Sequence, residues 1–354
     1  MAKEVKMKTN HKTLKVKETL INLGLLSFFV LLGLIIVEIY LRYTQQQQHQ
    51  ALVQKYQEIE KESLSRKLCA QASKTPGLIY EIIPNQCGAN SHGYFDNEYS
   101  YEKAPETKRI VVIGDSIAQG LGLDQEADDT FGKRLERQLN SDTDQNIEVI
   151  VLAVTGYSTS QELIVLQEQA LKYDPDLIIW SYVFNDPAHP IYHNANGELG
   201  RYFYQPKIQV AHLLSKGFFS INEAIKAIPC DKEYHQHLHC VYWDEISANL
   251  NQIGDISQSN NIPVIFLIHP IFEDNNDFSQ YSLLNIHQKL TEAADKAGLI
   301  SIDLLNVFEQ YPSEELKLQP QDPWHPNEEG HQIIADVIED YLGANPTFSG
   351  SDHQ

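Results

Sequence analysis

Positive charge is scarce in most of this 354-residue sequence. Lys and Arg number 27 against 48 Asp and Glu, so the formal net charge is −21. Residues 1–42 hold seven of the basic and three of the acidic side chains, which leaves 20 against 45, a net charge of −25, for the remainder. A body this acidic repels phosphate backbones, so we expect no nucleic acid among its partners.

The sequence has no small-x-small cleavage site after its long apolar run, residues 20–41, "LINLGLLSFFVLLGLIIVEIYL". A cleaved signal peptide is therefore disfavoured. The run also has no polar face, which is untypical of a core helix in a soluble protein. As a helix it spans about 33 Å, enough for a bilayer core. We predict a transmembrane anchor over residues 20–41.

Lysine is concentrated before this run, with six lysines among residues 1–19. Short segments rich in Lys and Arg stay in the cytoplasm. We therefore expect residues 1–19 to form a cytoplasmic tail and everything after Arg42 to lie outside, in the periplasm or the extracellular space.

Cysteine is rare as well. The four cysteines are Cys69, Cys87, Cys230 and Cys240, an even number in a compartment where oxidation is expected. Three pairings are possible, and the simplest joins sequence neighbours, Cys69 with Cys87 and Cys230 with Cys240. The alternative is that they are buried free thiols, since lone cysteines often behave as small apolar residues.

Composition divides the rest of the chain. Residues 42–108 begin with a polar, Gln-rich stretch and continue with apolar residues at helical spacing, which indicates a stalk and lead-in. Residues 109–345 form the main domain. Residues 346–354 form a flexible tail.

Strand and helix patterns alternate in the main domain. Short apolar strands are predicted over 110–113, 147–153, 176–183, 263–268 and 299–303, and helices over 130–140, 159–173, 282–297 and 327–342. Thr159 and Glu162 are spaced as a capping box. Near-continuous apolar strands separated by amphipathic helices indicate a parallel sheet covered on both faces. The predicted fold class is α/β, a three-layer α/β/α sandwich, in which ligands bind beyond the carboxyl ends of the strands.

Polar residues and glycine gather at those strand ends. Ser116 follows the first strand, Gly156 the second and Asn185 the third, and Asp322 and His325 stand three residues apart before the last helix. Each alone is a common cap or turn residue. Together they are the parts needed for acyl transfer.

Four segments, "GDSIAQG", "GYST", "FND" and "DPWHPN", resemble the blocks of the SGNH (GDSL) hydrolase family, in the family's order over residues 109–342. The resemblance implies a flavodoxin-like parallel sheet and a serine hydrolase that needs no cofactor. One departure is Val183, which stands where the third block commonly has Gly. This departure affects the expected oxyanion site.

The resemblance also implies a role for each matched residue. Ser116 is the nucleophile, His325 the general base and then acid, and Asp322 the group that orients the imidazole. The backbone N–H groups of Ser116 and Gly156 and the side-chain amide of Asn185 stabilise the oxyanion. Serine needs such a base, and the tetrahedral intermediate needs such donors.

Four neighbouring residues have open roles. Asp115 either caps or orients the turn that carries Ser116. Asp303, at the end of the last strand, is a rival for the orienting acid. Trp324 either floors the pocket or fills the core, and His269 either touches the site or packs structurally.

A long segment, about residues 187–250, interrupts the alternating pattern. Segments of this length between strands are often functional. We expect a cap over the Ser116 rim, stapled by Cys230 and Cys240. The alternative is a surface excursion that packs on its own aromatic side chains.

Three histidines in this segment, His235, His237 and His239, raise the possibility of a metal site. Alternation would put all three on one side of a strand or loop. Their spacing matches no common zinc pattern, and an oxidising compartment favours the disulfide. We expect no metal.

These patterns together predict a serine esterase that hydrolyses O-acyl esters, O-acetyl esters included, outside the cytoplasm. The expected partners are an ester substrate, such as an acylated glycan or lipid, and a membrane through residues 20–41. The alternatives are an O-acyltransferase acting on envelope carbohydrate and a non-catalytic domain that binds glycan.

Overall fold

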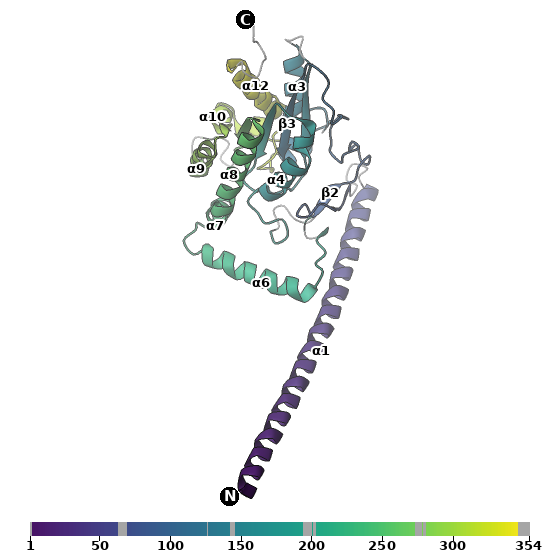
Figure 1. Ribbon diagram of the computed structural model, residues 1–354. Coiled ribbons are helices and arrows are strands. Elements are labelled where there is room, and N and C mark those ends of the chain that lie inside the picture. The colour runs from purple at the N-terminus through teal and green to yellow at the C-terminus, as the bar shows by residue number, and fades with distance from the viewer. Residues whose placement is uncertain are drawn as a thin grey trace. The chain divides into compact units, whose positions relative to one another are not determined.

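The computed structural model describes residues 2–62, 69–125, 127–141, 146–193, 200, 203–272, 278 and 281–345, and Figure 1 shows its ribbon. The chain divides into two compact units. One comprises Met1–Lys67 with Gln205–Asn222, and the other Leu68–Tyr204 with Glu223–Gln354. The predicted flexible tail, residues 346–354, lies outside the described residues.

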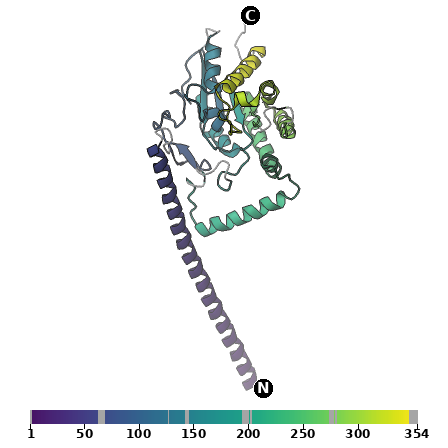
Figure 2. The same ribbon diagram turned by 180° about the vertical axis from the view of Figure 1, so that it is seen from behind.

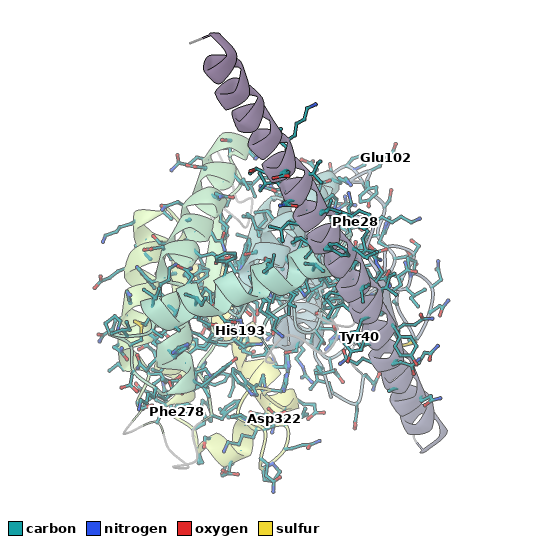
Figure 3. The ribbon with its side chains drawn as sticks, turned by 90° about the horizontal axis from the view of Figure 1, so that it is seen from below. Phe28, Tyr40, Glu102, His193, Phe278 and Asp322 are labelled. Atoms are coloured by element: carbon teal, nitrogen blue, oxygen red, sulfur yellow. A yellow bond between two sulfur atoms is a disulfide. The ribbon has the colours of Figure 1, made fainter. Side chains whose placement is uncertain are left out.

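The first unit contains α1 (Ala2–Glu62) and most of α6 (Gln209–Lys226). Within α1, Lys17–Gln48 is long and apolar enough to cross a membrane, and its apolar core is not buried in the protein. Phe28 and Tyr40 lie along α1 (Figure 3). The N–H groups of Gln209 and Val210 donate to the Glu38 carboxylate at 2.9 and 2.8 Å. A side chain of α1 thus accepts from the first turn of α6.

A five-stranded parallel sheet forms the centre of the second unit. Its order is β4 (Asn146–Ala153), β3 (Thr107–Gly114), β5 (Leu177–Tyr182), β6 (Val264–Ile268) and β7 (Ile300–Asp303). All neighbouring pairs are parallel. The predicted α/β class and all five predicted strands are confirmed.

Helices cover both faces of this sheet (Figures 1 and 2). Because successive side chains of a strand point to opposite faces, Val111 and Ile113 join one core and Ile110 and Val112 the other. One core is closed by α4 (Thr159–Glu168), α8 (Trp243–Asn260) and α9 (Leu284–Lys296), the other by α3 (Phe131–Ser141), α10 (Leu305–Phe308) and α12 (Glu328–Ala344). This is the predicted three-layer sandwich.

The capping box of α4 lies one residue earlier than predicted. Ser158 is the N-cap, and its N–H donates to the Gln161 side chain at 3.1 Å. The prediction of Thr159 and Glu162 was wrong because Glu162 points into the protein, where it is fully buried. A short 3₁₀ helix, Ala170–Tyr173, follows α4.

The lead-in packs onto the edge of the sheet where the strands end. Strands β1 (Ala70–Ala72) and β2 (Tyr80–Ile82) form an antiparallel pair, and the Cys69–Cys87 disulfide lies beside it. The hydroxyl of Tyr80 donates to the carbonyl of Thr155 at 2.8 Å, in the turn after β4. The lead-in from Cys69 onward therefore belongs to the same packing unit as the sheet.

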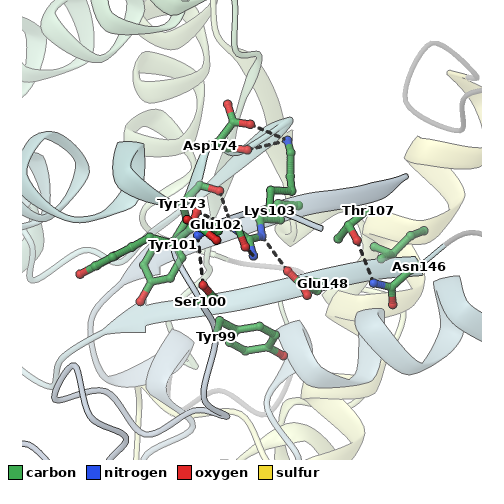
Figure 4. Close-up of polar contacts among 12 residues, drawn as sticks. Tyr99, Ser100, Tyr101, Glu102, Lys103, Thr107, Asn146, Glu148, Tyr173 and Asp174 are labelled. Carbon is green, nitrogen blue, oxygen red and sulfur yellow. Dashed lines mark hydrogen bonds and ion pairs between the residues drawn. The ribbon is translucent and has the colours of Figure 1, made fainter. Parts of the chain in front are cut away.

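The opposite end of β3 is fixed by Arg109, which is 1% exposed. Its Nε donates to Glu148 at 2.6 Å, and its Nη1 donates to the carbonyls of Tyr101 and Tyr173. Figure 4 shows these partners together with the neighbouring ion pair of Lys103 and Asp174, whose side chains are 3.2 Å apart. These contacts hold the lead-in against the sheet.

The segment between β5 and β6 contains helices that the sequence analysis did not predict. After α6 come α7 (Tyr234–Val241) and then α8, which makes the crossover to β6. Cys230 and Cys240 form a disulfide between the chain after α6 and α7. Both disulfides thus join sequence neighbours, as the simplest of the three pairings predicted.

Candidate active site

The turn after β3 places Ser116 at the edge of the sheet. Helix α2 (Ser116–Gln119) starts two residues after the strand, and Asp115 caps it by accepting from the N–H of Ile117 at 3.2 Å. A Cβ added at Gly114 would lie 2.9 Å from the Cβ atoms of both Ala118 and Ser181. Glycine is therefore needed for α2 to approach the sheet this closely.

The loop that carries His325 is closed by backbone hydrogen bonds. It joins α11 (Ser313–Leu316) to α12. The N–H of Leu318 donates to the carbonyl of His325 at 2.9 Å, and the N–H of Asn327 to that of Leu316 at 2.8 Å. The Asn327 side chain then caps α12 by accepting from Gly330 at 3.0 Å. Both ends of the loop are fixed.

Ser116, His325 and Asp322 form a continuous line of hydrogen bonds. The Nε2 atom of His325 is 2.9 Å from the Oγ of Ser116, across 209 residues of sequence. Its Nδ1 is 2.8 Å from the Oδ2 of Asp322. The other carboxylate oxygen accepts from the backbone N–H groups of Trp324 and His325 at 2.9 and 3.1 Å. Asp322 is therefore held at both oxygens, and Figure 3 labels its position.

The surroundings of Asp322 favour its ionised form. Partial burial raises its pKa, but the hydrogen bond from the His325 ring and the backbone donors lower it more, so the net pKa lies below the usual value. An ionised acceptor at Nδ1 fixes the proton of the neutral ring on that nitrogen. The Nε2 atom is then free to accept the Ser116 proton.

Asp115 also contacts the serine. Its Oδ2 is 3.2 Å from the Ser116 Oγ and 3.4 Å from the Asn185 Nδ2. Complete burial raises the pKa of Asp115, although nearby His325 and its hydrogen bonds oppose this. Because a hydroxyl carries one proton, Ser116 donates to either Asp115 or His325 at any moment. Asp115 thus both caps α2 and links Asn185 to the serine.

Gly156 lies in the turn after β4, with a φ of 76° that favours glycine. The preceding residue, Thr155, donates from its N–H and its hydroxyl to the Gln119 side chain at 2.8 and 2.9 Å. This ties the turn to α2. Within the described part of the chain, the N–H groups of Ser116 and Gly156 donate no hydrogen bond. Both are available to a ligand.

The turn after β5 positions Asn185. The N–H of Val183 donates to the Asp186 carboxylate at 2.8 Å, and the N–H of Asp186 donates to the carbonyl of Val183 at 3.0 Å. Val183, which replaces the usual glycine, is buried. Its N–H is therefore engaged inside the protein.

Two other candidates lie away from His325. Asp303 Oδ1 is 2.7 Å from the Nδ1 of His287, so this rival acid orients a different ring. His269 is buried, with its Nε2 2.8 Å from the Oγ of Ser181. Burial lowers the pKa of His269 to about 3, which keeps it neutral. Its contacts are those of a packed core residue.

Two buried carboxyl groups near the site were missed by the sequence analysis. Glu162 and Asp186 are both essentially inaccessible to solvent. Burial first, and then the neighbouring carboxyl groups, raise the pKa of each well above its usual value. Their surroundings therefore favour the protonated, neutral form of each carboxyl group. Nothing in the sequence signalled this, because Glu162 had the spacing of a capping residue and Asp186 that of a turn residue.

The expected alternation of His235, His237 and His239 was wrong because this segment is the helix α7. His239 is buried, with Nε2 3.0 Å from the hydroxyl of Tyr182, and His235 Nδ1 is 2.8 Å from Glu233. The nearby cysteines are joined in the disulfide and offer no thiolate. Among the described residues, no group of three or more His, Cys, Asp or Glu side chains could hold a metal ion.

Trp324 connects the histidine loop with α7. It packs against the core on the α4, α8 and α9 side of the sheet. Its ring also meets the ring of His235 edge-on, with centroids 4.9 Å apart. The segment between β5 and β6 therefore contacts the loop that carries His325.

Solved structures of similar fold include several ester hydrolases. A lipase/acylhydrolase from Enterococcus faecalis is 17% identical over 67% of this chain and 96% of its own, with a TM-score of 0.43. The esterase EstA from a Pseudoalteromonas species is 15% identical over 67% and 97%, with a TM-score of 0.41. A catalytic mutant of an acetylxylan esterase from Geobacillus stearothermophilus is 14% identical over 67% and 94%, with a TM-score of 0.45.

No curated protein sequence matches this chain. The GDSL-like Lipase/Acylhydrolase family matches residues 112–333, a range that begins inside β3 and ends inside α12. This range contains the strand ends and the loop described above. The chain therefore belongs to the GDSL-like lipase/acylhydrolase family, whose members hydrolyse esters.

Proposed function

We propose that this protein is a membrane-anchored serine esterase that hydrolyses O-acyl esters outside the cytoplasm, with Ser116, His325 and Asp322 as its catalytic triad. The observation that carries the proposal is the line of contacts from Ser116 Oγ to His325 Nε2 at 2.9 Å and from His325 Nδ1 to Asp322 Oδ2 at 2.8 Å. These are the distances at which a base can take the proton of a nucleophile.

The chemistry follows from this line. His325 accepts the hydroxyl proton as Ser116 Oγ attacks the ester carbonyl, and a tetrahedral oxyanion forms. The imidazolium, stabilised by the Asp322 carboxylate, then donates its proton to the leaving alcohol. Water, deprotonated by His325 in turn, attacks the acyl-enzyme, and His325 then returns that proton to Ser116 Oγ as the carboxylic acid leaves.

The oxyanion needs donors aimed at its negative charge. We assign this role to the N–H groups of Ser116 and Gly156, which have no acceptor in the described part of the chain, and to the side-chain amide of Asn185. Asp115 positions that amide, with its Oδ2 3.4 Å from the Asn185 Nδ2. Asp115 is a positioning residue in this scheme.

The location rests on α1 and on the disulfides. A long apolar N-terminal helix and two disulfides point to the secretory path. We assign residues 20–41 as a retained anchor, residues 1–19 as a cytoplasmic tail, and the unit that carries Ser116 to the outer side. Protease added to intact cells should then cut tagged protein after Arg42 and spare a tag at the N-terminus. Loss of the N-terminal tag instead would reverse the topology.

The substrate we propose is an acyl ester, O-acetyl included, on an envelope glycan. Trp324 lies one residue from His325 and is partly exposed, so it can offer an apolar face to a sugar ring or acyl chain. The segment 187–250 reaches this position through His235. We infer that it contributes to substrate selection.

A fluorophosphonate probe tests the nucleophile. The full-length protein should be labelled once, on Ser116, and Ser116→Ala should abolish labelling and lower turnover of a short-chain ester by about 10⁶-fold. The matched control is Ser100→Ala, an exposed serine of the lead-in, which should change neither. Persistent labelling of Ser116→Ala would refute the assignment.

Product analysis tests the substrate and the reaction. Acetylated polysaccharide should release acetate, and release should be unchanged when an unacetylated acceptor sugar is added. Acetate lost to the acceptor instead of to water would identify a transferase. Normal glycan binding without any turnover in the wild type would identify a binding domain.

A further inference from the structure

Helix α6 exposes a continuous apolar face. Leu214, Phe218, Ile221 and Ile225 recur at the spacing that aligns side chains on one side of a helix, and they are 58%, 72%, 60% and 61% exposed. Ile228, just beyond the helix, is 81% exposed. Large apolar side chains gathered in this way mark a surface that another body covers.

The opposite side of α6 is mostly polar, with Phe219 as its one large apolar residue. His212, Lys216 and Glu223 lie there by the 100° rotation between successive residues. A helix with one apolar and one polar face suits the boundary between water and lipid.

The position at which α6 contacts α1 indicates what covers this apolar face. Glu38 accepts from the N–H groups of Gln209 and Val210, and it pairs with Arg42 at 2.7 Å. Glu38 lies near the end of the apolar run 20–41. Tyr40 follows it and is 64% exposed, as is typical of the aromatic belt of a membrane interface. Helix α6 therefore starts at the interface level of α1.

The direction of α6 is also the one expected for a helix that lies in the plane of the membrane surface. Figure 1 shows it leaving α1 crosswise rather than alongside it. A helix that starts at the interface and runs across a membrane-spanning helix extends along the surface of the bilayer.

Charge agrees with this placement. Residues 205–228 contain three Lys and one Glu, a net charge of +2. The rest of the chain after Arg42 then has 17 basic and 44 acidic side chains, a net charge of −27. The basic segment is the part of an otherwise acidic body that anionic lipid headgroups attract.

We propose that α6 is an interfacial helix whose apolar face enters the outer leaflet of the membrane that α1 spans. This inference rests on the proposed anchor, because it is the anchor that brings a bilayer to the level of Glu38. The helix would lie about 5–10 Å deep, at the boundary of headgroups and acyl chains. It gives the protein a second membrane contact, in the segment that also carries α7.

Site-specific quenching in liposomes tests the inference on the full-length protein. The four native cysteines are all in disulfides, so a thiol-reactive dye labels only an introduced cysteine. Phe218→Cys places the dye on the apolar face, and Lys216→Cys, two residues away on the polar face, is the matched control. Leu32→Cys, inside the apolar run of α1, reports on the anchor. Turnover of a short-chain ester shows that each variant is folded.

Spin-labelled lipids should quench the dye at residue 218 at least about twofold more than the dye at residue 216, because the apolar face lies deeper in the interface. Iodide in the water should instead quench the dye at residue 216 more than the dye at residue 218. Quenching at residue 32 without quenching at 218 would overturn the inference and leave the anchor intact. No lipid quenching at 32 would overturn the anchor itself. A dye at 218 that is shielded from iodide and escapes lipid quenching, together with disulfide cross-linking of unlabelled Phe218→Cys between copies, would show that α6 packs against a second chain instead.

Discussion

His325 Nδ1 lies 2.8 Å from Asp322 Oδ2, within a single turn of one closed loop. In the proposed mechanism this pair, rather than a partner from another strand, orients the imidazole toward Ser116. Asp303, the other candidate for the orienting acid, has its Oδ1 2.7 Å from the Nδ1 of His287. Two Asp–His pairs of almost equal length thus stand on the same domain, and only one of them reaches the serine.

Asp322→Asn should lower kcat by about 10⁴-fold, because an amide at this position no longer holds the ring proton on Nδ1. Asp303→Asn is the matched control, since it makes the same change at the other pair, and kcat should stay within a few-fold of the wild type. Ester hydrolysis under saturating substrate measures both. If the Asp303 variant were the one to lose activity, the assignment of the orienting acid would be reversed.

Asn185→Ala should lower kcat by about 10²- to 10³-fold with little change in KM, because an oxyanion donor acts mainly on the transition state. Asn306→Ala removes an exposed amide that bonds the Asp303 carbonyl, and it should leave kcat unchanged. Steady-state kinetics separates the two parameters. A raised KM with normal kcat would instead make Asn185 a residue that binds substrate in its ground state.

Glu162→Gln should make stability less dependent on pH. Burial and then Asp115 raise the pKa of Glu162 above its usual 4.5, so the folded chain keeps a proton that the unfolded chain loses above that pH. The free energy of unfolding then falls as pH rises, by about 1.4 kcal/mol per pH unit for one such group. A Gln side chain does not titrate, so the variant lacks this dependence on pH. Its free energy of unfolding should therefore rise relative to that of the wild type from pH 5 to pH 8.

Urea unfolding of the detergent-solubilised protein at these two pH values measures the difference. Glu168→Gln, an exposed change on the same helix, should leave the pH dependence as it is in the wild type. Equal loss of stability in Glu162→Gln at both pH values would mean that Glu162 is ionised and paired in the folded state.

The Cys69–Cys87 disulfide closes a loop of 18 residues around the β1–β2 pair. Replacing both cysteines with alanine should lower the free energy of unfolding by about 3 kcal/mol, as loop closure of this length implies. Denaturant midpoints of oxidised wild type and variant measure the loss. Reduction of the wild type should cost at least as much, because it opens both disulfides. An unchanged midpoint in the variant would show that packing alone holds the lead-in.

The sequence predicted the sheet well because each of its strands is buried on both faces. A run such as Ile110–Ile113 has no polar alternative, and the helices between the strands carry clear periodicity. The strand ends then indicated the site, since parallel strands must end at one edge. The roles of Ser116 and His325 as nucleophile and base came from the resemblance of the motif segments and not from this reasoning.

Contacts formed between distant segments could not be predicted in this way. Glu162 looked like a capping residue because the spacing rule takes no account of burial, and Ser158 proved to be the cap. Helices α6 and α7 were missed because their segment follows neither the strand period nor the strand–helix alternation. The contact of His235 with Trp324 leaves no trace in either local sequence.

The sequence separation of 209 between Ser116 and His325 has a consequence for the biosynthesis of the protein. With His325 as the proposed base, a nascent polypeptide cannot carry out hydrolysis before residue 325 has been made and has reached Ser116. Contacts this remote in sequence also form late in folding. In the proposed topology, a chain halfway through export is therefore inactive, and it becomes active only after the loop that carries His325 has crossed and docked at Ser116.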